Sequence, residues 1–129
     1  MKIKIDFVSN SSSTTYIAVL PSTFDINDFY KELGPTGKSP ISEFLAFLYE
    51  NIKYESTSYE DYINKQPNEW ALNLPIRIRN KIEVMKKRGA TIRVGHFSSD
   101  GNFLEQYFCM SSFEIDSQNI YINMINCFW

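Results

Sequence analysis

The sequence has few of the residues from which metal centres and disulfide frameworks are built. It contains one histidine, His96, and two cysteines, Cys109 and Cys127, in 129 residues. Two cysteines without a C-x-x-C pair or a set of histidines give neither zinc spacing nor a disulfide framework. The carboxylates are scattered and give no ligand spacing either. We therefore expect free thiols, no metal and no other cofactor.

Long apolar runs and glycine-rich loops are also lacking. No stretch approaches the ~18 consecutive apolar residues of a membrane span, and the N-terminus does not have the basic-then-apolar layout of a secretory signal. We expect a cytoplasmic protein with no membrane partner. The five glycines are isolated, so there is no phosphate-binding glycine motif, and conventional mononucleotide and dinucleotide folds are disfavoured.

Catalytic constellations are equally scarce. His96 lies on the apolar face of a predicted strand, two residues after Val94, where we expect a hydrogen-bonded structural histidine. A Cys109–His96 dyad is excluded, because the expected hairpin separates the two residues by roughly 16 Å along the strands. A nucleophile and its base need hydrogen-bond contact. We assign no catalytic residue, and the balance favours a binding protein over an enzyme.

What the sequence does contain is the core of one α+β domain over residues 1–129. Apolar residues make up 43% and aromatic residues 16%, enough for a chain of this length to fold unaided. Apolar periodicity predicts strands at 2–8, 16–20, 90–97, 103–110 and 120–124. Helices are predicted at 26–33 with Asp25 as cap, from 40 to 52, at 57–66 with Thr57 as cap, and at 75–89.

The order of these elements predicts how they pack. We expect the first two strands to pair as a hairpin. An antiparallel sheet built from this hairpin and the C-terminal strands is then packed by the three to four helices between them. In the last helix, Ile78, Ile82 and Met85 fall on one apolar stripe. Whether the strands at the two ends share one sheet stays open.

Charge is unevenly distributed, although the net charge is only −2. Between Arg77 and Arg93 seven basic residues face one acidic residue, Glu83. We predict a ligand-binding basic surface on the last helix and the next strand, formed by Arg77, Lys81, Arg88 and Arg93. The alternative is that basic residues near the helix end only complement its dipole. Because the whole chain is acidic, a small anion or a protein is a more natural partner than duplex nucleic acid.

Two polar regions are further candidates. Tyr54, Tyr59, Tyr62 and Trp70 lie in the most polar third of the chain and are predicted interface anchors, with ordinary packing as the alternative. A hydroxyl-rich stretch, including Asn10, Ser11, Ser12, Ser13 and Thr14, separates the first two strands. It could form a stable turn, line an anion or nucleotide site, or accept a covalent modification.

The segment from Phe7 to Ile17, FVSNSSSTTYI, resembles the start of a group of small, uncharacterised bacterial and bacteriophage proteins. These open with a strand followed by F-V-[ST]-N-S-S-S-S-S-F-[IV]. Here Thr14 and Thr15 replace serines and Tyr16 replaces phenylalanine. The resemblance covers about the first twenty residues. It implies a bacterial or phage origin and carries no established activity.

Together these features predict a non-catalytic binding or interaction protein. A protein or a small, nucleotide-like anion is the expected partner, and analogy with small phage proteins suggests a host-interaction or anti-defence role. The alternative is an enzyme that acts on a nucleotide or phosphate ester through the serine-rich stretch, with His96 or a carboxylate as base. Nothing in the sequence indicates the oligomeric state.

Overall fold

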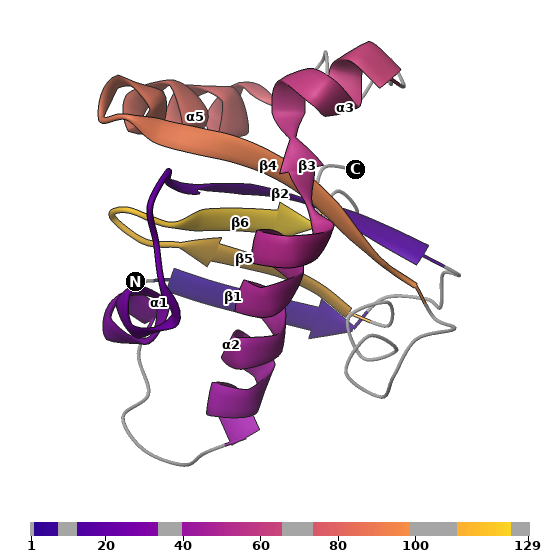
Figure 1. Ribbon diagram of the computed structural model, residues 1–129, viewed down its shortest axis with the longest axis vertical. Helices are drawn as coiled ribbons and strands as arrows, with labels where there is room; N and C mark the ends of the chain where they lie inside the picture. Colours follow the sequence, from indigo (N-terminus) through magenta and orange to yellow (C-terminus); the bar gives the residue numbers. More distant parts are fainter. Residues whose placement is uncertain (1, 8–12, 34–39, 66–73, 99–110, 125–129) are drawn as a thin grey trace.

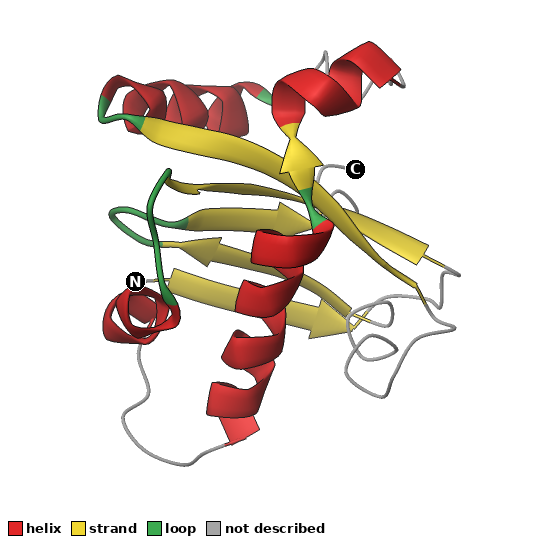
Figure 2. Ribbon diagram, viewed as in Figure 1, coloured by secondary structure: helices red, strands yellow, loops and turns green. Residues whose placement is uncertain are grey.

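The computed structural model describes residues 2–7, 13–33, 40–65, 74–98 and 111–124. The strands are β1 (Lys2–Phe7), β2 (Ser13–Pro21), β3 (Thr57–Ser58), β4 (Ala90–Ser98), β5 (Ser111–Asp116) and β6 (Tyr121–Met124). The helices are α1 (Ile26–Leu33), α2 (Pro40–Glu50), α3 (Tyr59–Lys65) and α5 (Ile76–Lys87), and a π-helical segment, η1 (Asn51–Glu55), follows α2. Strands at both ends with helices between them confirm the α+β class (Figure 2). The strand predicted at 103–110 lies outside the described residues.

The described strands form one sheet in the order β1-β5-β6-β2-β4-β3, and every neighbouring pair is antiparallel (Figure 1). The longest pairing joins β2 to β4, from Ser13 opposite Ser98 to Pro21 opposite Ala90. On its other side β2 pairs with β6, and β5 links β6 to β1. Strands from the two ends of the chain are therefore interleaved within a single sheet.

The predicted N-terminal hairpin is wrong, because β5 and β6 lie between β1 and β2. Residues 16 to 20 of β2 are completely buried, and its two edges are occupied by β4 and β6, so neither edge is left for β1. The alternating strand β1 instead lies at the sheet edge, where Lys4 is in register with Glu114.

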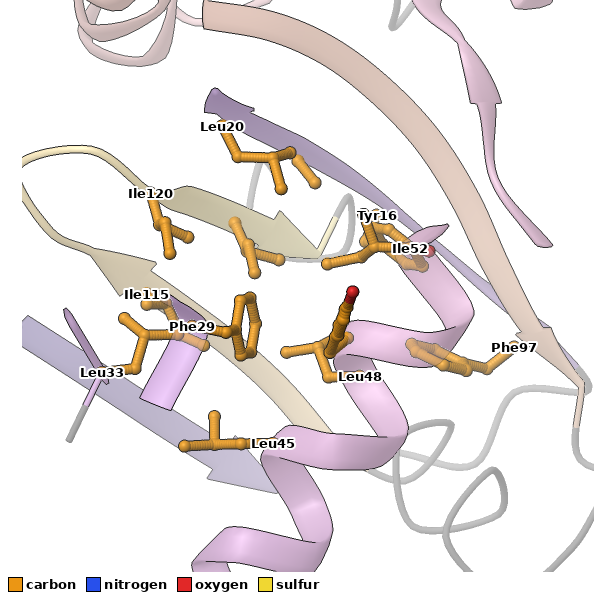
Figure 3. Close-up of a cluster of buried hydrophobic side chains, with 13 residues drawn as sticks. Tyr16, Leu20, Phe29, Leu33, Leu45, Leu48, Ile52, Phe97, Ile115 and Ile120 are labelled. Carbon is orange, nitrogen blue, oxygen red and sulfur yellow. The ribbon is translucent and has the colours of Figure 1, made fainter. Parts of the chain in front are cut away.

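One face of the sheet is covered by α1, α2 and η1, and it holds the larger hydrophobic cluster (Figure 3). In Figure 3, Phe29 of α1 and Leu48 of α2 lie between Ile120 and Phe97, which come from the sheet side. Burial of each such side chain stabilises the fold by roughly 1.5–3 kcal/mol. The buried members are Tyr16, Ala18, Leu20, Phe29, Leu33, Leu45, Leu48, Tyr49, Ile52, Phe97, Ile115, Ile120 and Ile122.

The opposite face is covered by α5. The predicted apolar stripe of this helix is confirmed, since Ile78, Ile82 and Met85 are all buried. They pack on the alternate side chains of the central strands, among them Ile17 of β2 and Ile92 of β4. The strand β2 thus sends Tyr16, Ala18 and Leu20 to one cluster and Ile17 and Val19 to the other.

The helix caps show how far local signals hold. Asp25 caps α1 as predicted, because its Oδ1 accepts a hydrogen bond from the amide of Asp28 at 2.8 Å. At α3 the predicted cap is wrong by one residue. Thr57 belongs to β3, and the hydroxyl of Ser58 accepts the amide hydrogen of Asp61 at 3.2 Å.

The end of α2 departs from the expected α-helix to residue 52. The α-helix ends at Glu50, and η1 continues with a wider turn in which Asn51 and Ile52 are buried. The Tyr16 hydroxyl donates to Asn51 Oδ1 at 2.6 Å, and the Tyr16 ring fills the space that a Cβ at Gly95 would occupy. Burial raises the pKa of Tyr16 far above its ordinary value. This packing fixes η1 against β2 and β4.

Candidate anion-binding cleft

The first predicted basic residue, Arg77, lies at the start of α5 and contacts the sheet. Its Nη1 donates to Glu114 Oε2 at 2.8 Å. The same carboxylate oxygen accepts from the Tyr121 hydroxyl at 2.6 Å and from Asn123 Nδ2 at 3.1 Å. Burial, and next the hydrogen bond to Glu114, raise the pKa of Tyr121 well above its usual value. Arg77 therefore closes a buried polar network on β5 and β6.

Lys81 and Arg88 also contact the sheet, further along α5. Lys81 Nζ lies 2.8 Å from Asp116 Oδ1 and 3.3 Å from the Ser117 carbonyl oxygen. Arg88 Nη1 donates to the Gln118 carbonyl oxygen at 3.3 Å. We call Arg77, Lys81 and Arg88 the docking row. All three use donors to hold α5 on β5 and on the turn that follows it.

The fourth predicted residue, Arg93, lies apart from this row, in the middle of β4. Its Nε donates to Ser56 Oγ at 2.6 Å and its Nη2 to the Ser56 carbonyl oxygen at 2.7 Å. Opposite it in the sheet stands Ser58 of β3. Since Ser56 follows η1 directly, the guanidinium is held in a defined position by the chain segment between η1 and α3.

Arg93 lines a cleft of about 560 Å³ at the edge of the sheet, between the loop after β2, β3, α3 and the end of α5. We call it the anion cleft. Its polar lining is dominated by three cations, Lys53, Lys86 and Arg93, and by four hydroxyl groups, whereas it has one carboxylate, that of Glu60. The full lining is Ser22, Thr23, Phe24, Lys53, Ser58, Glu60, Lys86, Ala90, Thr91, Ile92 and Arg93.

The three cleft cations come from two distant parts of the chain, Lys53 from η1 and Lys86 and Arg93 from α5 and the strand that follows it. Lys53 Nζ donates to the Tyr49 hydroxyl at 3.0 Å and lies 5.5 Å from the centre of that ring. This hydrogen bond raises the pKa of Lys53, so its ammonium group stays charged. None of the three forms an ion pair with a described carboxylate. Glu60 is the one carboxylate in the lining of the cleft, and Asp25 adds a weaker electrostatic interaction with Lys53.

A second, more open cleft of about 620 Å³ lies between α1 and the β5–β6 turn. Its charged lining is Asp28, Lys31 and Glu32. Glu32 Oε1 already accepts hydrogen bonds from the Ser117 hydroxyl at 2.7 Å and the Asn119 amide at 2.5 Å. This carboxylate ties α1 to the turn, and the other one, Asp28, accepts a hydrogen bond from the Asp25 amide at 3.3 Å, so both acidic groups are already engaged within the fold.

The predicted interface aromatics are separated by the fold. Tyr54 is 71% exposed, and its ring lies 5.7 Å from Lys53 Nζ. Tyr59 and Tyr62, both on α3, are half-buried, and Tyr59 packs against the cluster beneath α5. Trp70 lies outside the described residues. Of this group, the structure shows a largely exposed ring only for Tyr54.

The strand pattern predicts a structural, hydrogen-bonded His96 on the apolar face of its strand, but the side chain is exposed. Ile92, on the same face of β4, packs under α5, but the cluster beneath that helix does not extend to His96. Among the predicted hydroxyl-rich residues, Asn10, Ser11 and Ser12 lie outside the described part of the chain. Ser13 and Thr14 begin β2, opposite Ser98 and Phe97.

Two further sequence expectations concern metals and membranes. In the described ranges, no three His, Cys, Asp or Glu side chains gather in a way that could hold a metal ion. No helix within those ranges is long and apolar enough to cross a bilayer. In comparisons with protein-family models, curated proteins and solved structures, no match to the chain is found.

Sequence reasoning missed most of the anion cleft. Lys86 belongs to the basic run that drew attention to α5, but Lys53 lies in the acidic part of the chain. Nothing in the neighbouring sequence marks Ser22, Thr23 or Thr91 as residues of a binding site. The convergence depends on β3 pairing with β4, a contact between segments more than thirty residues apart that periodicity within either segment does not reveal.

Proposed function

We propose that the chain is a non-catalytic binding protein that holds a small phosphate-bearing anion in the anion cleft. The observation that carries the proposal is the convergence of Lys53, Lys86 and Arg93 on one cleft with a single opposing carboxylate. A volume of about 560 Å³ lies within the roughly 300–1,000 Å³ typical of small-molecule sites.

The contacts around the cleft favour an anion with several oxygens. Ammonium and guanidinium donors bind phosphate oxygens through charge-assisted hydrogen bonds, which are about twice as strong as neutral ones. Arg93 is held in place by two hydrogen bonds to Ser56, so binding costs it little side-chain entropy. The hydroxyl of Thr23 also lines the cleft and supplies a neutral donor for a remaining oxygen, whereas that of Thr91 already donates to the Leu20 carbonyl oxygen at 3.2 Å.

Calorimetric titration with inorganic pyrophosphate tests the proposal at low ionic strength, where screening is weakest. We expect saturable binding to the wild type and about tenfold weaker binding to Lys86→Ala, which loses one charge-assisted contact. Lys87→Ala is the matched control, because this neighbouring lysine has the same charge and exposure but does not line the cleft. Absence of binding to the wild type, or equal weakening in both variants, contradicts the proposal.

Other parts of the sequence interpretation remain predictions. The anion cleft is compatible with three of them, although none follows from it. These are the docking row as a ligand site, a protein partner at Tyr54, and a host-interaction or anti-defence role in a bacterium or phage. The enzyme alternative depends on the serine-rich stretch, most of which lies outside the described residues.

A further inference from the structure

A smaller cleft of about 200 Å³ adjoins the anion cleft. Its floor consists of four buried aliphatic side chains from the cluster beneath α5, which are Ile17, Leu74, Ile82 and Ile92. Its rim carries Tyr59, Arg79, Glu83 and Lys86. We call it the apolar cleft. An open cleft with an aliphatic floor favours a flat or apolar group, because such a group loses little hydration on entering.

The two clefts meet at the end of α5 and the start of β4. Lys86 and Ile92 line both of them. A ligand that places a phosphate among the cleft cations therefore has an apolar site within reach on the other side of Lys86. The apolar cleft is smaller than the roughly 300–1,000 Å³ of a complete ligand site, so it fits one ring system or a short chain rather than a whole ligand.

We infer that the ligand is a mononucleotide, with its phosphate in the anion cleft and its base in the apolar cleft. The inference rests on the proposed function and adds the chemical class of the ligand. A base has two apolar faces and a polar edge. The aliphatic floor and the ring of Tyr59 can pack against the two faces of the base. Glu83 and Arg79 lie one helical turn apart on α5 and offer an acceptor and donors for the polar edge of the base.

An alkyl phosphate is the competing occupant, since its chain would also cover the floor. It would make no use of the carboxylate and guanidinium groups at the rim, nor of stacking on Tyr59. Stacking of a base on an aromatic side chain contributes about 1–3 kcal/mol. The rim of the apolar cleft therefore favours the base over the alkyl chain.

Titrations with AMP, GMP, octyl phosphate and inorganic pyrophosphate against the intact chain test this inference. We expect at least one of the two nucleotides to bind about tenfold more tightly than pyrophosphate and octyl phosphate. Nucleotides that bind no better than pyrophosphate overturn the inference and leave the proposed function intact. Octyl phosphate that binds as tightly as the nucleotides assigns an aliphatic group to the apolar cleft and also overturns it. Failure of all four probes overturns the proposed function itself.

A variant at the rim separates the two clefts. Tyr59→Leu keeps apolar bulk but removes the ring, so nucleotide affinity should fall about tenfold while pyrophosphate affinity stays unchanged. Tyr62→Leu is the matched control, because Tyr62 is a half-buried tyrosine on the same helix that does not line the cleft. Glu83→Gln, at an exposed position, provides a second test that does not disturb packing. Unchanged nucleotide affinity in both Tyr59→Leu and Glu83→Gln contradicts the placement of the base.

Discussion

The docking row and the cleft cations carry the same charge but face different partners. Arg77 and Lys81 of the docking row form ion pairs with Glu114 and Asp116 on β5. Arg93 and Lys53, among the cleft cations, donate instead to neutral groups, the serine at 56 and a tyrosine hydroxyl. The difference teaches that basic residues close together in the sequence do not define a site. The sign of the groups that the fold places opposite them decides whether their charge is available to a ligand.

The largest expected effect comes from removing the acceptor beneath the docking row. Glu114→Ala should lower the free energy of unfolding by about 2–4 kcal/mol, because it leaves the Tyr121 hydroxyl and Asn123 Nδ2 without this acceptor in a buried site. Urea denaturation measures the loss. Pyrophosphate affinity of the folded variant should be unchanged, since Glu114 does not line the anion cleft.

Glu114→Gln is the control for that variant. Its side-chain oxygen keeps one acceptor for the network, so the loss of stability should be clearly smaller. If Glu114→Ala instead costs less than about 1 kcal/mol, the typical net value of one hydrogen bond, the docking row does not depend on this network. The contrast with the cleft cations would then lose its physical basis.

Local patterns predict the parts of the fold that depend on neighbours in sequence. The alternation in β1, the cap at Asp25 and the apolar stripe of α5 were all readable, because each arises within one helix or strand. Strand pairing is different, since a hairpin between β1 and β2 and the observed insertion of β5 and β6 satisfy the same local patterns. Only the packing of a whole sheet selects between them.

The anion cleft likewise combines residues that local sequence predicts with residues that only tertiary packing brings together. Arg93 was predicted from the basic run, and it does line the cleft. Lys53 could not be predicted, because η1 reaches the sheet edge through tertiary contacts such as the hydrogen bond from Tyr16 to Asn51. The exposure of His96 was not predicted, for a related reason. Its strand face is correctly inferred, but the point at which α5 stops covering that face is a property of helix length and orientation.

The next prediction concerns how the stability of the network beneath the docking row depends on pH. Burial raises the pKa values of Tyr16 and Tyr121 above the ordinary value of 10, so the unfolded chain loses these protons first as pH rises. Each tyrosine therefore contributes stability that is fully present below pH 10 and is lost above it, by up to about 1.4 kcal/mol per pH unit. Tyr121→Phe should flatten this decline between pH 10 and 11, as measured by chemical denaturation.

The anion cleft should respond differently over the same interval. The hydrogen bond to Tyr49 raises the pKa of Lys53, so this cation keeps its proton at a pH where an ordinary lysine begins to lose it. Pyrophosphate binding that persists above pH 10.5, the ordinary pKa of lysine, supports that difference in the folded protein. For the tyrosine prediction, the contrary outcome is a stability profile of Tyr121→Phe that matches the wild type above pH 10. It would show that Tyr121 titrates normally and that water reaches its hydrogen bond with Glu114.

The smallest expected effect is at Lys81, where both members of the ion pair with Asp116 are about one-third exposed. Lys81→Ala should cost about 0.5 kcal/mol of stability at low salt, the usual value of a partly exposed pair. The difference from the wild type should shrink in about 1 M salt, where the Debye length falls to about 3 Å. Lys87→Ala, which removes an exposed lysine from the same helix, should leave stability unchanged at either salt concentration.

A weakened pyrophosphate affinity in Lys81→Ala would transfer this residue from the docking row to the ligand site, because a lysine that only holds α5 on the sheet has no contact with the cleft. The same pair of measurements, stability and affinity, therefore separates the docking row from the cleft cations, and a lysine such as Lys87 that belongs to neither group should change neither quantity.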